Sequence, residues 1–224
     1  MMRTLNNRPF RTSFCIRSRV AGDPDWASYA SGPIQASKFI EQYKKDKTGH
    51  RDWPRLRWQP VSISRIPERV IRAVVVAEDS RFFQHNGFDE EAFKKAMEYN
   101  FSKRRFIFGA STISQQTVKN LFLSPSRNPL RKWHELVLTF LMERNISKER
   151  IMELYLNIAE FGRGIYGVEA ASRYYWNKSV SQLTYQEATE LAATLPGPVK
   201  HNPATQTKYF VRHKKKIRKH LGYI

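Results

Sequence analysis

The sequence predicts a mainly α-helical protein, and three observations lead to this class. From residue 66 onward, apolar residues recur with the i, i+3, i+4, i+7 spacing of an amphipathic helix. Ser147 is placed as a helix N-cap, and Thr184 with Glu187 has the spacing of a capping box. No convincing run of alternating apolar and polar residues indicates a sheet, and no internal repeat is visible.

The composition is that of a folded domain with a large excess of positive charge. Of the 224 residues, 41% are hydrophobic, which is enough for a core and argues against disorder. The formal net charge of +19 points to a polyanionic partner, which is nucleic acid, an anionic membrane surface or a phosphorylated substrate. Cys15 is the single cysteine, so no internal disulfide is expected. No segment reaches the roughly 18 apolar residues that span a bilayer, so we expect a soluble or peripheral protein.

We expect an arm, a domain and a tail along the chain. Residues 1–60 are expected to form a basic N-terminal arm, irregular except for a short helix around residues 36–45. Residues 61–200 hold the helical domain. Residues 201–224 form a basic C-terminal tail, because no acidic residue follows Glu190.

The first half of the domain is expected to contain two helices. The first carries Glu78 on the same stripe as three apolar residues, which are Ile71, Val74 and Val75. Residues 101–108 combine basic and aromatic side chains. The second helix spans about residues 111–123 and ends before Pro125.

Three further helices are expected in the second half. The helix over residues 130–145 has an apolar stripe formed by Trp133, Leu136, Val137, Phe140 and Leu141. The next helix begins after Ser147 and should bury Ile151, Leu154, Tyr155 and Ile158. A turn with three glycines follows, and the last helix should bury Ala188, Leu191, Ala192 and Leu195 before it stops at Pro196.

Two acidic residues are candidates for catalysis. Glu78 shares an apolar stripe, and burial there would make its carboxylate a better proton acceptor near neutral pH. The alternative is a buried glutamate paired with one of the many arginines. Glu135 lies nearly opposite the apolar stripe of its own helix, so it faces either a cleft or solvent.

A polar stripe on the helix over residues 111–123 suits a phosphate group. The stripe consists of Thr112, Gln115, Gln116 and Lys119, and the helix N-terminus offers free N–H groups. Arg131 and Lys132 add positive charge at the start of the following helix. The alternative is a solvated polar face. Residues 101–108 suit a membrane interface, a flexible loop or a nucleic-acid contact, and the C-terminal tail suits solvent or anionic lipid.

Read together, four segments resemble the four signatures of the peptidoglycan glycosyltransferases, glycosyltransferase family 51. The segments begin at residues 78, 109, 131 and 147, and they read EDSRFFQHNGFD, GASTISQQTVKNLF, RKWHE and SKERIMELYLN. The resemblance covers about residues 61–198. Because no transpeptidase domain follows, the sequence resembles the monofunctional members of the family.

The resemblance implies a lysozyme-like fold with a larger head lobe and a smaller, mobile, membrane-facing lobe that contains residues 101–108. It also implies an enzyme that polymerises lipid II into glycan strands, with inversion and with release of undecaprenyl pyrophosphate. Glu78 would be the general base and Glu135 the second catalytic carboxylate. The substrate-binding residues carried over are Asp79, Phe82, His85, Ser111, Thr112, Gln115, Gln116, Lys119, Asn120 and Arg131, with Lys119 and Arg131 on the pyrophosphate and His85 as a structural hydrogen-bonder.

The resemblance also sets expectations for cofactors, partners and location. A Mg²⁺ or Mn²⁺ ion at Glu135 or Asp79 is chemically reasonable, no His/Cys cluster suggests zinc, and no organic cofactor is expected. The expected partners are lipid II, the nascent glycan-pyrophosphate-lipid, an anionic membrane surface, penicillin-binding proteins and divisome or elongasome components. The location implied is the periplasmic face of the bacterial inner membrane, although the transmembrane helix usual in the family is not visible here.

Two other functions are weighed against this one. A lysozyme-like enzyme that cleaves peptidoglycan would share the helical fold and the catalytic glutamate, but it needs no cationic phosphate stripe. A nucleic-acid binder would explain the net charge. The basic residues are spread along the chain without a recognisable nucleic-acid motif, so no nucleic-acid partner is expected.

Overall fold

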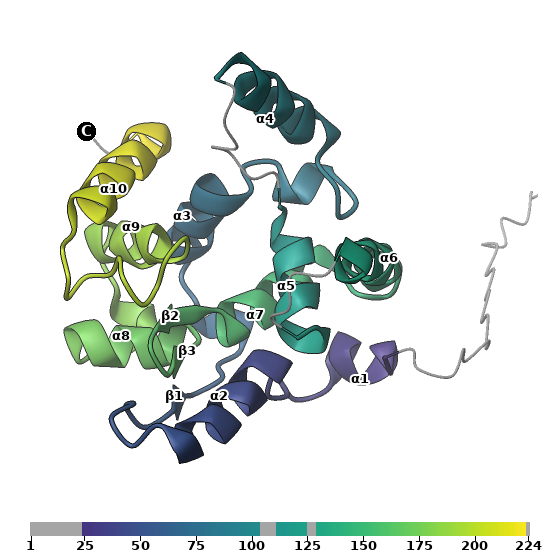
Figure 1. The fold of residues 1–224 in the computed structure, drawn as a ribbon. Coiled ribbons are helices and arrows are strands. Elements are labelled where there is room, and N and C mark those ends of the chain that lie inside the picture. Colours follow the sequence, from purple (N-terminus) through teal and green to yellow (C-terminus); the bar gives the residue numbers. More distant parts are fainter. Residues whose placement is uncertain (1–23, 104–110, 125–128, 223–224) are drawn as a thin grey trace, which may run out of the picture.

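The computed structural model describes residues 24–103, 111–124 and 129–222, and within these ranges the protein is mostly helical (Figure 1). The mainly α class is therefore confirmed. The helices are α1 Trp26–Ser31, α2 Lys38–Gly49, α3 Glu68–Glu78, α4 Glu90–Ser102, α5 Ile113–Phe122, α6 Pro129–Asn145, α7 Lys148–Ile158, α8 Val168–Trp176, α9 Tyr185–Thr194 and α10 Lys208–Leu221. In the described residues, no helix is both long enough and apolar enough to cross a bilayer.

A small three-stranded sheet joins the start of the described chain to its middle. The strands are β1 Arg57–Trp58, β2 Glu160–Gly162 and β3 Ile165–Tyr166, in the order β1-β3-β2. β3 pairs in parallel with β1 and antiparallel with β2. The sequence analysis did not predict these strands, because two or three residues are too few to show an alternating pattern.

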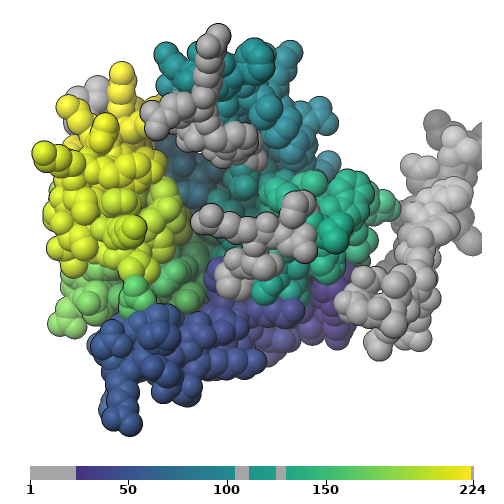
Figure 2. Space-filling model, viewed as in Figure 1, coloured from purple at the N-terminus to yellow at the C-terminus, as the bar shows by residue number. Residues whose placement is uncertain are grey.

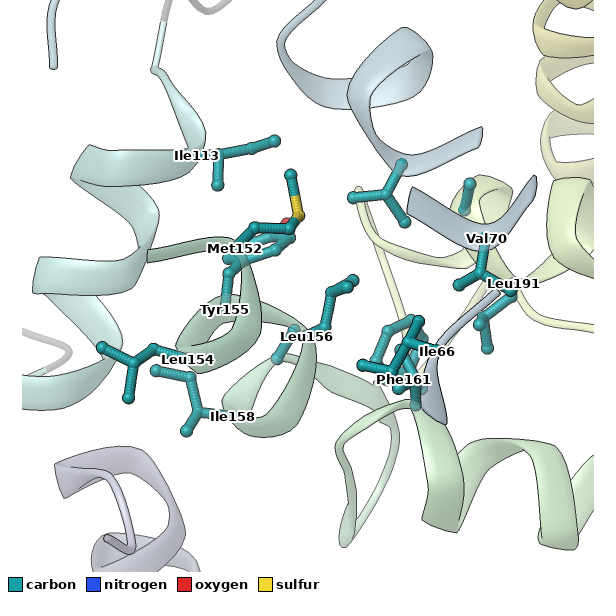
Figure 3. Packing of buried hydrophobic residues seen from close by; sticks show 14 of the residues in the cluster. Ile66, Val70, Ile113, Met152, Leu154, Tyr155, Leu156, Ile158, Phe161 and Leu191 are labelled. Atoms are coloured by element: carbon teal, nitrogen blue, oxygen red, sulfur yellow. The ribbon is translucent and has the colours of Figure 1, made fainter. Parts of the chain in front are cut away.

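Helix α7 lies at the centre of the core (Figure 3). The four residues predicted to be buried on this helix are indeed buried, and so are all the others from Ile151 to Ile158. Helix α5 packs against one side of α7, while α3 packs against α9. The helices that carry the candidate site residues are therefore held by a rigid, apolar centre.

The buried stripe of α3 differs by one position from the predicted one. Val70, Ala73 and Val74 are buried, while Ile71 and Val75 are only partly buried. Glu78, four residues after Val74 and the last residue of α3, therefore lies at the edge of the core and stays partly exposed. This position lets its carboxylate reach solvent-filled space while most of the side chain is desolvated.

The apolar stripe predicted on α6 does not form the buried face of this helix. Trp133 and Phe140 are 68% and 54% exposed. The buried side instead contains Glu135, Leu138, Thr139 and Met142. Polar residues are tolerated on this side because each finds a partner; for example, the Thr139 hydroxyl donates to the backbone oxygen of Glu135 (2.7 Å).

Residues 24–60 of the predicted arm are more ordered than expected, and the short helix predicted around residues 36–45 is confirmed as α2. This part contains α1, α2 and β1, and it is tied to α7 through hydrogen bonds. Trp58 donates through Nε1 to the Asn157 carbonyl (2.9 Å), and directly after this part the Asn157 side chain accepts from the Val61 N–H (2.7 Å) and donates to the Val61 carbonyl (2.9 Å). Arg150 donates through Nε to the carbonyl of Tyr29 (2.7 Å). Sequence periodicity could not reveal these contacts, since the partners lie about a hundred residues apart.

The basic tail predicted over residues 201–224 is also corrected, because residues 208–221 form helix α10. Its apolar residues Phe210, Ile217 and Leu221 are buried against the domain, where α10 packs on α9 and α3. Most of residues 101–108 lie outside the described residues, so the expectations for this segment and for two lobes stay predictions.

Candidate active site

Glu78 lies beside a hydrogen-bond donor and a cation that both come from α5. The Gln116 Nε2 atom donates to Glu78 Oε2 over 2.7 Å. Burial raises the pKa of the Glu78 carboxyl, while the bond from Gln116 and the positive charge of Lys119 act in the opposite direction. The nearby Asp79 carboxylate raises this pKa further. Burial is the largest of these effects, so the Glu78 carboxylate is a stronger base than a solvated glutamate.

The Gln116 side chain is itself oriented by Tyr155 of α7. The Tyr155 hydroxyl donates to Gln116 Oε1 over 3.1 Å, which leaves the NH₂ end of the amide facing Glu78. Tyr155 is only 1% exposed, and burial raises the pKa of its hydroxyl well above the ordinary value. It therefore stays protonated and acts as a donor at every physiological pH.

Lys119 lies one turn beyond Gln116, within the electrostatic reach of a cluster on α6. Burial lowers the pKa of the Lys119 ammonium, Glu135 raises it, and Arg131 and Lys132 lower it. Glu135 is 3% exposed and accepts from Arg131 Nη1 (3.2 Å) and Lys132 Nζ (2.5 Å). Glu135 therefore faces neither solvent nor an open cleft, and its carboxylate positions two cations near Lys119.

A second carboxylate, Asp79, occupies the N-terminus of α5. Its Oδ2 atom accepts from the Ile113 N–H over 3.0 Å, and both its oxygens accept from His85 Nε2 at 2.9 and 3.0 Å. The other ring nitrogen of His85 accepts from the Gly87 N–H (3.1 Å). The chain's own carboxylate thus takes the position that the sequence analysis offered to a substrate anion.

The predicted magnesium or manganese sites do not fit the residues present. Asp79, His85 and Asp89 lie close enough to share an ion, but both ring nitrogens of His85 are used. Asp89 Oδ1 accepts from the Ala92 N–H over 2.9 Å. Glu135 is held by two cations that would repel a metal ion. We therefore derive no catalytic step through a metal at these residues.

Three predicted substrate-binding residues have other partners or no exposed surface. Thr112 and Gln115 form a capping box at the start of α5, where each side chain accepts from the other's backbone N–H. The Thr112 hydroxyl also donates to the carbonyl of Gly87 over 2.7 Å. Phe82 is fully buried in the core, with Lys148 Nζ 4.4 Å from its ring centroid. Gln115 and Phe82 lie behind the surface of the site, whereas Thr112 also lines a small hollow beside Glu78.

Two hollows open on either side of Gln116 and Glu78. One, of about 170 Å³, is lined by Glu78, Ser111 and the end of α3. The other, of about 250 Å³, is lined by Gln116, Lys119 and Asn120, together with Tyr155 and Glu160. The structure therefore brings Glu78 and Lys119 close to Gln116, which contacts Glu78 and lines one hollow with Lys119. Arg131 borders neither hollow, and its charge acts on Lys119 electrostatically.

The larger hollow is also lined by residues that were not predicted as site residues from the sequence, among them Phe39, Glu160 and Tyr166. Phe39 comes from α2, in the region predicted to be an arm, and Glu160 and Tyr166 come from the unpredicted strands. Burial raises the pKa of Glu160 to about 7, against the opposing effects of Arg163 and a hydrogen bond from the Gly164 backbone. No hydrophobic periodicity predicts these positions. The available signal is that Glu160 and Tyr166 flank a segment with two glycines, Gly162 and Gly164.

Comparisons with known proteins agree on one family. A model of the Transglycosylase family matches residues 47–221. A biosynthetic peptidoglycan transglycosylase of Haemophilus influenzae is 48% identical over 168 residues, which is 75% of this chain and 68% of the relative. Proteins of the same name from Methylobacillus flagellatus and Bdellovibrio bacteriovorus are 42% and 46% identical over 168 residues, covering 75% of this chain and 73% and 64% of the relatives.

Proposed function

The chain belongs to the transglycosylase family of peptidoglycan glycosyltransferases in cell-wall synthesis, and we propose that it polymerises lipid II with Glu78 as the general base. The matched residues 47–221 cover most of the chain, and peptidoglycan synthesis places such an enzyme in the cell envelope. The single observation that carries the assignment of the base is the Glu78 carboxylate, desolvated and held by Gln116 beside the Lys119 cation.

The proposed reaction is a displacement at the anomeric carbon of the growing glycan. The 4-hydroxyl oxygen of the incoming lipid II forms a bond to this carbon, while the bond from the carbon to the pyrophosphate oxygen breaks. The hydroxyl proton passes to Glu78, and the electron pair leaves with undecaprenyl pyrophosphate. Attack from the face opposite the leaving group inverts the configuration.

The raised pKa of Glu78 supports its role as the base. General-base catalysis is most effective when the pKa of the base lies near the working pH. Burial raises the pKa of Glu78 above that of a solvated glutamate, while the Gln116 bond and the Lys119 charge limit the rise. The balance of burial against these two groups suits proton transfer from a sugar hydroxyl.

The cations around Lys119 support the binding of the leaving pyrophosphate. Negative charge that develops on a leaving group is stabilised by preorganised cations in a partly desolvated site. Arg131 and Lys132 are fixed by Glu135, so Glu135 acts as a positioning carboxylate in this proposal.

The test is a pair of substitutions on one helix. Glu78→Gln keeps the shape and the bond to Gln116 but removes the base, so polymerisation of lipid II should fall about a hundredfold or more. Glu68→Gln, at the exposed start of the same α3 helix, is the matched control and should retain activity. Near-normal polymerisation by folded Glu78→Gln would rule out the assignment.

The same assay separates the other roles and functions. Lys119→Ala should weaken the use of the lipid-pyrophosphate donor, and an unchanged rate and apparent affinity would remove Lys119 from the site. Release of muropeptides from purified peptidoglycan would favour the cleavage alternative, which the family relationship does not support. We further propose that the protein works at the periplasmic face of the inner membrane with penicillin-binding proteins and divisome or elongasome components, which co-purification from envelope fractions would test.

A further inference from the structure

We propose that the exposed face of helix α10 is a docking surface for anionic phospholipid headgroups. The inference rests on the proposed function, because a lipid-linked substrate brings the enzyme to a bilayer. The evidence is the distribution of charge on α10, its packing, and its place in the molecule.

The basic residues of α10 form a straight row opposite its buried side. Lys208, Arg212, Lys215 and Lys219 recur with the spacing i, i+4, i+7, i+11, which places them within a narrow stripe of the helix, and all four are exposed. At 1.5 Å per residue, the row is about 16 Å long. A straight row of this length suits a plane of phosphate groups.

The row has no acidic residue on its own helix to offset it, since Glu190 is the last acid of the chain. Lys214, which points toward the domain, forms an ion pair with Glu190 over 3.0 Å. Exposed Lys216 and Arg218 flank the row and widen its positive field. Phe210, Ile217 and Leu221 on the opposite side of α10 are buried against the domain. The basic row therefore points away from the domain.

A lipid interface explains one further property of this surface. Val211 is 44% exposed, and together with the hydrocarbon stems of the neighbouring lysines and arginines it lines a shallow, mainly apolar depression. Cationic side chains with exposed apolar stems suit the boundary between headgroups and acyl chains. There the charged end contacts phosphate and the hydrocarbon stem contacts the acyl chains. A nucleic-acid phosphate backbone would use only the charges.

The position of α10 agrees with this orientation. In the view of Figures 1 and 2, α10 and α4 both lie at the upper end of the molecule, and α2 lies at the lower end. Helix α4 also exposes large apolar side chains, which are Phe93, Met97 and Phe101. One end of the protein thus presents both cationic and apolar groups.

The experiment is flotation of the full-length protein with vesicles of phosphatidylcholine, with or without phosphatidylglycerol. The variant Arg212→Gln/Lys215→Gln/Lys219→Gln removes three charges of the row with residues that favour helix. The control Lys38→Gln/Lys44→Gln/Lys45→Gln removes the same charge from exposed positions of α2, at the opposite end. All proteins keep the arginines of residues 1–23.

We expect the unmodified protein to bind vesicles that contain phosphatidylglycerol, with an affinity that falls as salt is raised. Each basic residue near an anionic bilayer contributes about a fivefold gain in binding, so the α10 variant should bind about a hundredfold more weakly. The α2 variant should change far less. Equal unfolding midpoints would show that both variants are folded.

Three results would overturn the proposal. They are unchanged binding by the α10 variant, an equal loss in the α2 variant, and binding to duplex DNA but not to vesicles. The proposed function fails separately, because it is measured by lipid II polymerisation in neutral detergent. There the α10 variant should be active and Glu78→Gln inactive, whereas on vesicles Glu78→Gln should still bind.

Discussion

The substitution Tyr155→Phe tests how the proposed base is tuned. It removes one hydroxyl and keeps the buried ring, so packing around α7 is preserved. Without this donor, the Gln116 amide is oriented only by its own bond to Glu78. The carbonyl oxygen of the amide can then turn toward Glu78 and repel the carboxylate, in place of the NH₂ group that donates to it.

The magnitude follows from the bond that is lost. A hydrogen bond to a charged group contributes about 1.5–3 kcal/mol, and one pKa unit corresponds to about 1.4 kcal/mol. If the amide is correctly oriented for part of the time, the pKa of Glu78 should rise by about one unit. The other groups that face Glu78, which are Lys119 and Asp79, are unchanged by the substitution.

The assay is the pH profile of lipid II polymerisation, measured as kcat/KM. The base must be deprotonated, so a higher pKa moves the acid limb of the profile to higher pH by about one unit. Activity should therefore fall about tenfold on the acid side and less on the plateau. The matched control is Tyr175→Phe, which removes a buried hydroxyl that donates to the Phe161 carbonyl (2.7 Å) without touching Glu78.

An acid limb that stays in place in Tyr155→Phe, or that moves equally in Tyr175→Phe, would refute the reasoning. A double-mutant cycle gives a second check. In a Gln116→Leu background, Tyr155→Phe should produce no further shift, because the amide through which it acts is gone. Additive shifts would mean that Tyr155 influences the site by another route.

Three further predictions concern stability. Asn157→Ala removes three buried hydrogen bonds at 2.7, 2.9 and 2.8 Å and should lower the unfolding free energy by about 3 kcal/mol, seen as a drop in Tm of about 10 °C. Asn145→Ala, at an exposed position, should change Tm far less. Glu160 has a raised pKa of about 7, so its contribution to stability is full below pH 4.5 and lost as pH rises through 7. In urea unfolding, the unfolding free energy of Glu160→Gln relative to that of the unmodified protein should therefore increase by about 3 kcal/mol when the pH is raised from 4 to 8. A difference that does not change with pH would contradict this. Gly87→Ala should destabilise by about 2 kcal/mol in the same assay, because φ is +89° and a Cβ would lie 2.8 Å from Thr139 Cγ2; equal stability would contradict the strain argument.

Local signals in the sequence predicted the helices well where a cap and an apolar stripe agree. Thr184 and Glu187 form the expected capping box, and α9 buries Ala188 and Leu191 as predicted. The same approach failed for α6, because periodicity identifies an apolar stripe but not the neighbours that it meets. Here the apolar stripe faces outward, and a carboxylate satisfied by Arg131 faces inward.

The basic composition of residues 208–219 concealed an amphipathic helix. Phe210, Ile217 and Leu221 have helical spacing, but the surrounding lysines and arginines favoured a solvated tail over a packed element. Similarly, the arm prediction followed from the many arginines, serines and prolines in residues 1–60. Contacts such as that between Trp58 and the Asn157 carbonyl depend on tertiary structure and cannot be predicted from the local sequence pattern.

For the candidate site, the sequence identified the charged groups but not how they are connected. The four family-like segments placed Glu78, Lys119, Arg131 and Glu135 in one region, and the structure does couple them electrostatically. Sequence reasoning treated the polar stripe of α5 as a ligand surface. Thr112 and Gln115 are instead occupied by each other, because helix N-termini must satisfy their own free N–H groups first.

The bond between the Asp79 carboxylate and the Ile113 amide joins the last turn of α3 to the first turn of α5. Glu78 belongs to α3 and Lys119 to α5, so their separation is set during folding and not when a substrate arrives. Little reorganisation energy should then be required for proton transfer and departure of the leaving group. Any opening that admits a long lipid-linked chain must come from other parts of the molecule, which leaves α3 and α5 as a fixed frame for the chemistry.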